Sequence, residues 1–256
     1  GLVWGTRILL LFAAVSMTAK CLLFFFLAHD ESGPAKVRFL GPGSLAQLKK
    51  FGPTVKHMWS RKSIRFIWVV MVLYQSALTF SGTYFGIYIT ENLGVSPVFL
   101  SYFPMIRALM SFLLTFLVQT RLNRLPFKIP FGVGLGLYLL GQVLLLVAPF
   151  TPAGLILPLL IFYTLTEALG AALVLPQRDA FLNNALDDSN RIWELSMVNA
   201  MVVLVAALSS LVGARLVQEF RQGAFILALV AHTISLLATL FYPISDKEEA
   251  NINPAL

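Results

Sequence analysis

The sequence predicts an all-α, polytopic membrane protein with seven transmembrane helices. Hydrophobic residues make up 58% of its 256 residues and charged residues 12%, whereas a soluble domain has roughly 45–50% and about 25%. A transmembrane helix needs ~20 mostly apolar residues. Seven stretches meet this requirement with at most one charge well inside each: 8–28, 66–90, 96–119, 129–150, 153–175, 195–217 and 222–244.

The first predicted span, residues 8–28, forms a unit with residues 1–7 and is followed by a connection of different composition. The span contains Lys20, and no small-residue cleavage site follows it, so it does not resemble a signal peptide. The connection, residues 29–63, is rich in Gly, Pro, Lys and Arg. We expect a cytoplasmic linker that ends in short basic amphipathic segments on the membrane surface. It serves either as a tether between two bundles or as a binding site for lipid or a regulator.

The six later spans are separated by short connections. Those at 91–95, 149–152 and 218–221 have only a few residues each, so consecutive helices are expected to be antiparallel neighbours. We therefore expect residues 64–245 to form one six-helix bundle and residues 246–256 to form a tail.

The positions of Lys and Arg predict the orientation of the helices, because cytoplasmic connections carry an excess of these residues. The connections 29–65, 120–128 and 176–194 hold most of them, among them Arg121, Arg124, Lys128, Arg178 and Arg191. The opposite connections hold Arg7 and Arg221, with Arg215 if its span ends early. We expect a multi-pass protein of the cell membrane with a cytoplasmic C-terminus. The net charge of +7 then reflects topology, and no nucleic-acid partner is expected.

Two inner connections carry patterns that resemble a known family. Residues 118–128 read VQTRLNRLPFK, and residues 176–191 read PQRDAFLNNALDDSNR before a Ser-containing span. Together with one span, a long basic linker and six spans in two groups of three, these patterns resemble the C-terminal part of a major facilitator superfamily transporter. The family's inner turn, G-x-x-x-D-R-x-G-R-R, is only partly kept, because Gln119, Thr120 and Asn123 replace its glycines and Asp.

The resemblance implies two inverted three-helix repeats, 66–150 and 153–244, whose first helices line a central cavity. It also implies a partner, an N-terminal six-helix bundle that is missing from this chain. We expect the basic inner connections to act as a cytoplasmic gate in which Arg and acidic side chains pair when that side closes: Arg121, Arg124, Arg178, Asp179 and Arg191.

Three charged residues lie at mid-depth in the predicted spans. Counted from the outer ends at 1.5 Å per residue, Lys20, Arg107 and Glu167 lie roughly 16–21 Å deep, in a hydrocarbon core ~30 Å thick. A charge at that depth costs several kcal/mol unless it is paired or hydrated, which marks it as a candidate functional residue. We expect the long stem of Lys20 to snorkel toward the inner surface.

Glu167 is the strongest candidate for ion coupling or substrate binding. Tyr163, Thr166, Glu167 and Gly170 share one helical face, and a carboxyl group there can take up and release a proton as a cavity opens to alternate sides. The alternatives are a structural ion pair with Arg107 and a hydrated, snorkelled side chain. Arg107, which follows a Pro104 expected to kink its helix, can bind an anionic group or neutralise Glu167.

Other spans carry further polar or small residues. Gln75 and Thr79 share a face of the second span, which is expected to line the cavity, and Asn199 of the sixth span is assigned to the cavity as well. Small residues predict close helix packing, in a G-x-x-x-G pattern at 132–136 and at Ala206, Ser210 and Gly213. We interpret His232 as a packing residue, with a proton relay as the alternative.

These observations favour a transporter that moves a small solute by alternating access, driven by an ion gradient. The sequence lacks a Gly-rich phosphate loop with Lys and lacks paired His or Cys residues at metal-ligand spacing. We therefore expect no cofactor, no metal site, no enzymatic activity and no nucleotide-driven engine. The alternatives are a seven-helix receptor and a membrane scaffold or enzyme.

Overall fold

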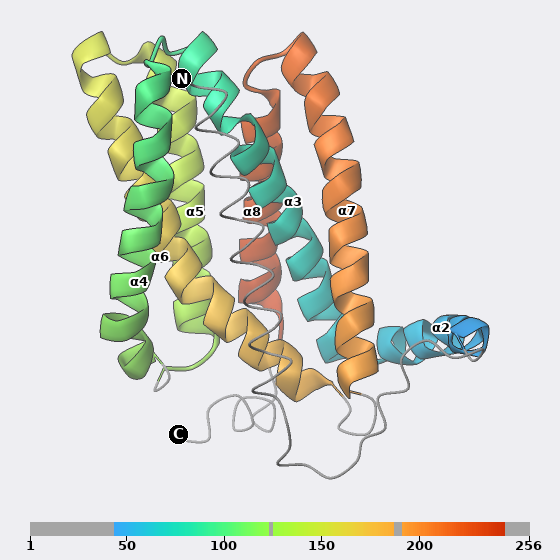
Figure 1. Ribbon diagram of the computed structural model, residues 1–256. Coiled ribbons are helices and arrows are strands. Elements are labelled where there is room, and N and C mark those ends of the chain that lie inside the picture. Colours follow the sequence, from blue (N-terminus) through green and yellow to red (C-terminus); the bar gives the residue numbers. More distant parts are fainter. Residues whose placement is uncertain (1–43, 123–124, 187–190, 244–256) are drawn as a thin grey trace, which may run out of the picture. The chain divides into compact units, whose positions relative to one another are not determined.

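A computed structural model describes residues 44–122, 125–186 and 191–243, and this part of the chain is helical, without strands (Figure 1). The chain divides into two compact units, Gly1–Lys49 and Lys50–Leu256. The second unit holds the helices discussed below. The predicted first span, residues 8–28, and most of the predicted linker lie outside the described residues.

Six helices in the described part are long and apolar enough to cross a membrane. The helices that contain them are α3 (Lys62–Glu91), α4 (Tyr102–Leu122) with the 3-10 turn η1 (Pro97–Ser101), α5 (Lys128–Val147) with η2 (Ala148–Phe150), α6 (Ala153–Ala185), α7 (Arg191–Glu219) and α8 (Gly223–Phe241). Six of the seven predicted spans are therefore confirmed. Helices of this number, length and composition are those of a membrane-embedded protein.

Three element boundaries differ from the expectation. Helix α2 (Ser44–Ser60) runs through Pro53 as one helix, where separate short segments were expected. Helix α6 continues past Pro176 to Ala185, so the end of the fifth span extends beyond the apolar stretch. Helix α4 begins at Tyr102 after η1. Pro104 thus lies in the first turn of α4, where its missing N–H breaks no hydrogen bond within that helix.

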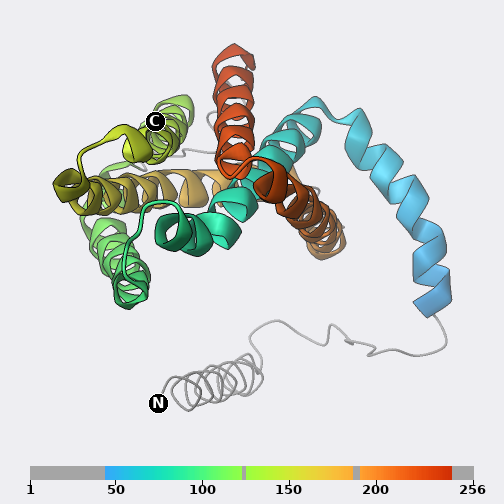
Figure 2. The ribbon, with the colours of Figure 1, turned by 90° about the horizontal axis from the view of Figure 1, so that it is seen from above.

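The helices pack as neighbours in two sets that meet at the centre (Figures 1 and 2). Helix α5 packs against α6 and α8, and α4 packs against α6. Helix α3 packs against α8, α7 and α6. Chain direction alternates from one helix to the next, as the short outer connections predict.

Glycines allow the closest of these contacts. A Cβ atom on Gly134 of α5 would lie 2.7 Å from Val174 Cγ2, and one on Gly170 of α6 would lie 3.0 Å from the carbonyl oxygen of Gly134. The predicted G-x-x-x-G pair does not make this contact, because a Cβ on Gly136 meets nothing within 4 Å. The prediction of close packing is confirmed for Gly213 of α7, whose Cβ would lie 2.6 Å from Tyr84.

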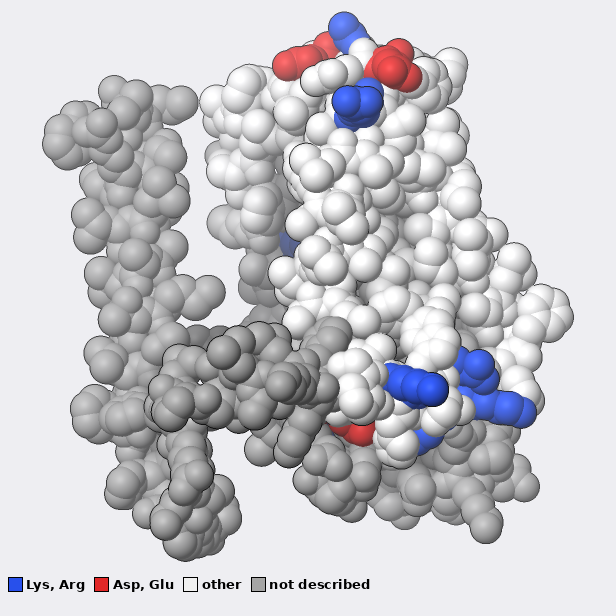
Figure 3. All heavy atoms as spheres, turned by 90° about the vertical axis from the view of Figure 1, so that its right-hand side faces the viewer, with Lys and Arg blue, Asp and Glu red and all other residues white. Residues whose placement is uncertain are grey.

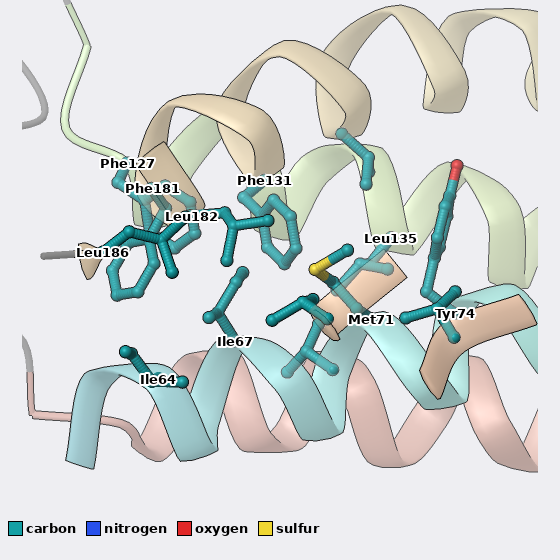
Figure 4. Close-up of a cluster of buried hydrophobic side chains, with 14 of the residues drawn as sticks. Ile64, Ile67, Met71, Tyr74, Phe127, Phe131, Leu135, Phe181, Leu182 and Leu186 are labelled. Atoms are coloured by element: carbon teal, nitrogen blue, oxygen red, sulfur yellow. The ribbon is translucent and has the colours of Figure 1, made fainter. Parts of the chain in front are cut away.

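Two clusters of buried side chains hold the helices together. One cluster lies near the start of α3 and joins residues of α3, α5 and α6, including Ile67, Met71, Phe131, Phe181 and Leu182 (Figure 4). The other lies toward the end of α3 and contains Tyr88, Phe103, Leu160 and Phe225. Lipid tails are as apolar as these side chains, so close packing, more than exclusion from water, stabilises such contacts in a membrane.

Charged side chains gather at the two ends of the bundle, and the surface between them is almost wholly uncharged on the face that Figure 3 shows. This banding agrees with the length of the apolar helices, since a bilayer has a hydrocarbon core ~30 Å thick. Arg107, inside the apolar span Pro97–Leu114, and Glu167, near the middle of α6, depart from the pattern.

Candidate functional site

A cavity of about 290 Å³ lies between α3, η1, α4 and α6. Pockets for small molecules have volumes of roughly 300–1,000 Å³, so this one is at the lower end of that range. Its lining combines aromatic, glycine and charged residues: Gly82, Phe85, Gly86, Leu100, Phe103, Pro104, Arg107, Tyr163, Thr164 and Glu167.

Helical spacing brings these residues to one place. Phe103 and Arg107 are one turn apart on α4, and Tyr163 and Glu167 are one turn apart on α6. Gly82 and Gly86 are one turn apart on α3, and their lack of side chains leaves room for the cavity. A Cβ on Gly82 would meet nothing within 4 Å, and one on Gly86 would meet only Leu100 at 3.5 Å.

The two mid-depth charges form an ion pair at this cavity. Nη1 of Arg107 donates to Oε2 of Glu167 at 3.2 Å. The two partners differ in exposure, because 39% of the Arg107 side chain is exposed but only 6% of the Glu167 side chain. The expected pairing of these residues is confirmed, and the pair presents its cationic partner to the cavity.

Gln142 of α5 supports the carboxylate from behind. Its Nε2 donates to Oε1 of Glu167 at 3.5 Å, and Gln142 itself is fully buried. Arg107 and Gln142 therefore donate to different oxygens of Glu167, and Tyr163 forms a further side-chain hydrogen bond with it. Gln142 was not among the predicted site residues, although an amide in a span as apolar as α5 is itself a signal, since buried polar groups require partners.

Aromatic rings form one wall of the cavity. Phe85 stacks on Tyr163 with centroids 5.2 Å apart and an interplanar angle of 25°. Phe85 also meets Phe103 edge to face at 5.4 Å. Such contacts fix ring orientation and leave flat apolar surfaces next to Arg107.

The other predicted substrate or ion residues lie outside this lining. Thr166 points toward α5, because its hydroxyl donates to the Tyr163 carbonyl at 2.7 Å and would lie 2.9 Å from a Cβ on Gly141. Thr79 donates to the Gln75 carbonyl at 2.8 Å, and both residues are half-buried on α3. Asn199 is exposed on α7. Their roles in binding stay predictions.

The predicted gate residues are dispersed among local contacts. Nη2 of Arg178 lies 2.7 Å from Oδ1 of the adjacent Asp179, and Arg191 is exposed at the start of α7. The side chain of Arg121 and the whole of Arg124 lie outside the described part. Arg178 and Asp179 thus pair with each other within one connection.

A polar cluster at the start of α3 was not predicted. Arg61 donates through Nη2 to Oε1 of Glu194 at 2.5 Å and through Nη1 to the carbonyl of Ala185 at 3.2 Å. Nδ1 of His57 lies 3.9 Å from the same Glu194 oxygen. Arg61 thus joins the end of α2 to the end of α6 and the first turn of α7.

His232 belongs to a buried aromatic cluster, in line with its interpretation as a packing residue. Its ring stacks on Tyr138 at 4.9 Å, and Tyr74 and Tyr138 share a hydrogen bond of 2.8 Å between their hydroxyls. The cluster joins α3, α5 and α8.

Known proteins offer no guide to this arrangement. Comparisons of the chain with protein-family models, with curated proteins and with solved structures find no match.

Proposed function

We propose that this chain is the C-terminal part of a major facilitator superfamily transporter, which moves a small solute by alternating access with an ion gradient as energy source. One observation carries the proposal: an ion pair at mid-depth of apolar helices borders a cavity lined by glycine and aromatic residues. Ionisable residues inside a membrane are costly, and they mark pathways for substrates or ions.

The packing of the helices supports an arrangement of two inverted three-helix repeats. If α3, α4 and α5 correspond to α6, α7 and α8, the contact of α5 with α6 corresponds to that of α8 with α3. In the same way the contact of α4 with α6 corresponds to that of α7 with α3. The contact of α7 with α8 is not matched to the same extent between α4 and α5. Corresponding helices run in opposite directions, as inverted repeats require.

The distribution of charge supports a cytoplasmic location for the end of the bundle where α3 begins. Arg61, Lys62, Arg65, Lys128 and Arg178 lie at that end of the helices, and a cytoplasmic excess of Lys and Arg is the rule for membrane proteins. The proposal therefore includes a multi-pass location in the cell membrane with a cytoplasmic C-terminus, and an N-terminal six-helix bundle as partner.

Alternating access is tested with a cysteine in the cavity. Gly82→Cys, in a Cys21→Ser background, places a thiol where a side chain has room. We expect a membrane-impermeant maleimide, added outside the vesicles, to label this thiol both in right-side-out and in inverted vesicles. Val133→Cys on α5, an exposed apolar position outside the cavity, is the control and stays unlabelled from both. Labelling of Gly82→Cys from one side only excludes alternating access.

Ion coupling is tested at Glu167. A carboxyl group that cycles its proton is essential for uphill transport but not for exchange of substrate between the two sides. Glu167→Gln is therefore expected to retain exchange and to lose accumulation driven by a pH gradient in proteoliposomes. Undiminished accumulation by Glu167→Gln removes this residue from the coupling mechanism.

A further inference from the structure

The two members of the ion pair differ in what they offer a ligand. A guanidinium group has five N–H donors in a rigid planar fork, and the structure gives one nitrogen of Arg107 to Glu167. The Arg107 side chain is 39% exposed and lines the cavity. Arg forks match the planar geometry of carboxylates and phosphates. Arg107 therefore has further N–H donors with which it can bind a ligand in the cavity.

Glu167 is far less accessible to a ligand. Its side chain is 6% exposed, Oε2 accepts from Arg107, and Oε1 accepts from Gln142. Both residues line the cavity, but Arg107 is the more accessible of the two charges. The geometry thus favours an anionic group as the ligand of this half of the site.

The rest of the lining indicates what the anionic group is attached to. Phe85 and Tyr163 stack, Phe103 meets Phe85 edge to face, and Leu100 closes the same region. Gly82 and Gly86 provide a surface without side chains opposite α4 and α6. A flat apolar body, such as an aromatic ring, fits between such surfaces and gains from stacking.

Resting on the proposed function, we propose that the cavity binds an organic anion whose carboxylate is joined to a flat apolar body. The substrate carboxylate forms the two parallel hydrogen bonds that Arg107 can donate and displaces Glu167 from the guanidinium. Glu167, without its counter-charge, takes up one proton, which comes from the buffered solution outside the cavity. Arg107 keeps one anionic partner throughout, so anion and proton enter together and the net charge of the cavity does not change.

No other charged group competes for this proton among the described residues that face Glu167. Tyr163 on its own helix, Tyr138 on α5 and Tyr74 on α3 interact with it electrostatically, but they are phenols. Gln142 carries no charge, and Arg107 is the remaining neighbour. Competition between Glu167 and the substrate for Arg107 is therefore enough to couple substrate binding to proton uptake.

Calorimetric binding of three probes to the purified protein tests the inference. 2-Naphthoate has the charge and the flat body, 2-naphthamide lacks the charge, and acetate lacks the body. The charge-assisted hydrogen bonds should make 2-naphthoate bind at least about tenfold more tightly than 2-naphthamide. Stacking and burial of its rings should make it bind at least about tenfold more tightly than acetate. Repeating the titration in buffers of different ionisation enthalpy should show uptake of close to one proton per anion.

Variants of the pair separate this mechanism from simple adsorption. Glu167→Gln removes the competitor, so 2-naphthoate should bind more tightly and without proton uptake. Arg107→Gln should lose the preference for 2-naphthoate over 2-naphthamide. Arg107→Lys, which keeps the charge without the planar fork, should retain part of it and serves if Arg107→Gln does not fold. Arg215→Gln, at an exposed position on α7, is the control and should bind as the unaltered protein does.

Three results would overturn the inference: tighter binding of 2-naphthylmethylammonium than of 2-naphthoate, an unchanged preference in Arg107→Gln, or unchanged proton uptake in Glu167→Gln. These outcomes are distinguishable from failure of the proposed function. Two-sided labelling of Gly82→Cys without a preference for anions contradicts this inference alone. Anion preference with one-sided labelling contradicts alternating access alone.

Discussion

At the scale of single residues, the ion pair between Arg107 and Glu167 combines two demands that conflict in most membrane proteins. Structural stability favours a fully buried and fully bonded pair, whereas a transport site requires a group that can change partners. The structure divides these demands, since Glu167 is buried with Gln142 behind it and Arg107 faces the cavity. Glu167 thus stabilises the site, and Arg107 is the side chain that is accessible to a ligand.

The energetic role of this pair is tested by removing its partners singly and together. Arg107→Gln leaves Glu167 buried without its cation. Because Arg107 is 39% exposed, the cost should stay below the ~3–5 kcal/mol of breaking a fully buried pair. The double variant Arg107→Gln/Glu167→Gln leaves no uncompensated charge and should recover most of that loss. Expression level and unfolding in mixed detergent micelles are the measurements. A double variant as unstable as the worse single one contradicts a pairwise role.

At the scale of the helices, the contact between α5 and α6 depends on two glycines. A Cβ on Gly170 would lie 2.9 Å from the Tyr138 ring and 3.0 Å from the Gly134 carbonyl, and the carbonyl cannot move without its helix. Gly170→Ala should therefore destabilise the bundle by about 1–3 kcal/mol, as overpacking does.

Gly136→Ala is the matched control. It meets nothing within 4 Å and should be neutral or stabilising, because Ala favours helix over Gly by up to about 1 kcal/mol. Equal effects of the two changes in detergent unfolding would exclude a close-contact role for Gly170.

The cluster around Arg61 ties three helix ends together at the end of the bundle where α3 begins. Glu194 is 1% exposed, and Arg61 donates to it and to the last carbonyl of α6. Arg61→Gln should cost about 1–3 kcal/mol, the range for a buried polar group that loses a partner. Lys62→Gln removes a cation at the exposed neighbouring position and should change stability by less than about 0.5 kcal/mol. The measurement is the free energy of unfolding of both variants. If Lys62→Gln lowers it as much as Arg61→Gln does, the cause is the total charge and not the contact of Arg61 with Glu194.

At the scale of the whole molecule, the sequence predicted what depends on composition and length. Six spans appear where long apolar stretches stand, and Arg107 pairs with Glu167 because two charges in a membrane each need a partner. The rotational setting of a helix is not predictable in this way. Thr166 and Glu167 are adjacent, yet Thr166 faces Gly141 and Glu167 faces Arg107. The same limit explains why Gly134 makes the contact expected of Gly132 and Gly136.

Contacts between distant segments were likewise beyond the reach of spacing. Arg61 and Glu194 are 133 residues apart, and their surroundings contain other basic and acidic residues that would serve equally well as partners. The residues that were predicted as a gate show the converse case. Arg178 finds its described partner in the adjacent Asp179, because a neighbour in the chain needs no tertiary structure to approach.

The last prediction concerns the balance between the two open states of the molecule. Exposed pairs such as Arg178 with Asp179 contribute only ~0–1 kcal/mol each, so a gate made of them must act through several weak contacts. Neutralising Arg178 and Arg191 together should disfavour closure of the cytoplasmic side and shift the equilibrium between the states by up to about fivefold. In the Gly82→Cys protein this shift raises the labelling rate from the cytoplasmic side and lowers it from the other. Arg221→Gln is the control, because Arg221 lies at the opposite end of the bundle and donates to Asn92. This change should not raise the labelling rate from the cytoplasmic side. Unchanged labelling from both sides in the double variant would reject the gate, because the equilibrium between the states cannot shift without changing how often Gly82 faces each side.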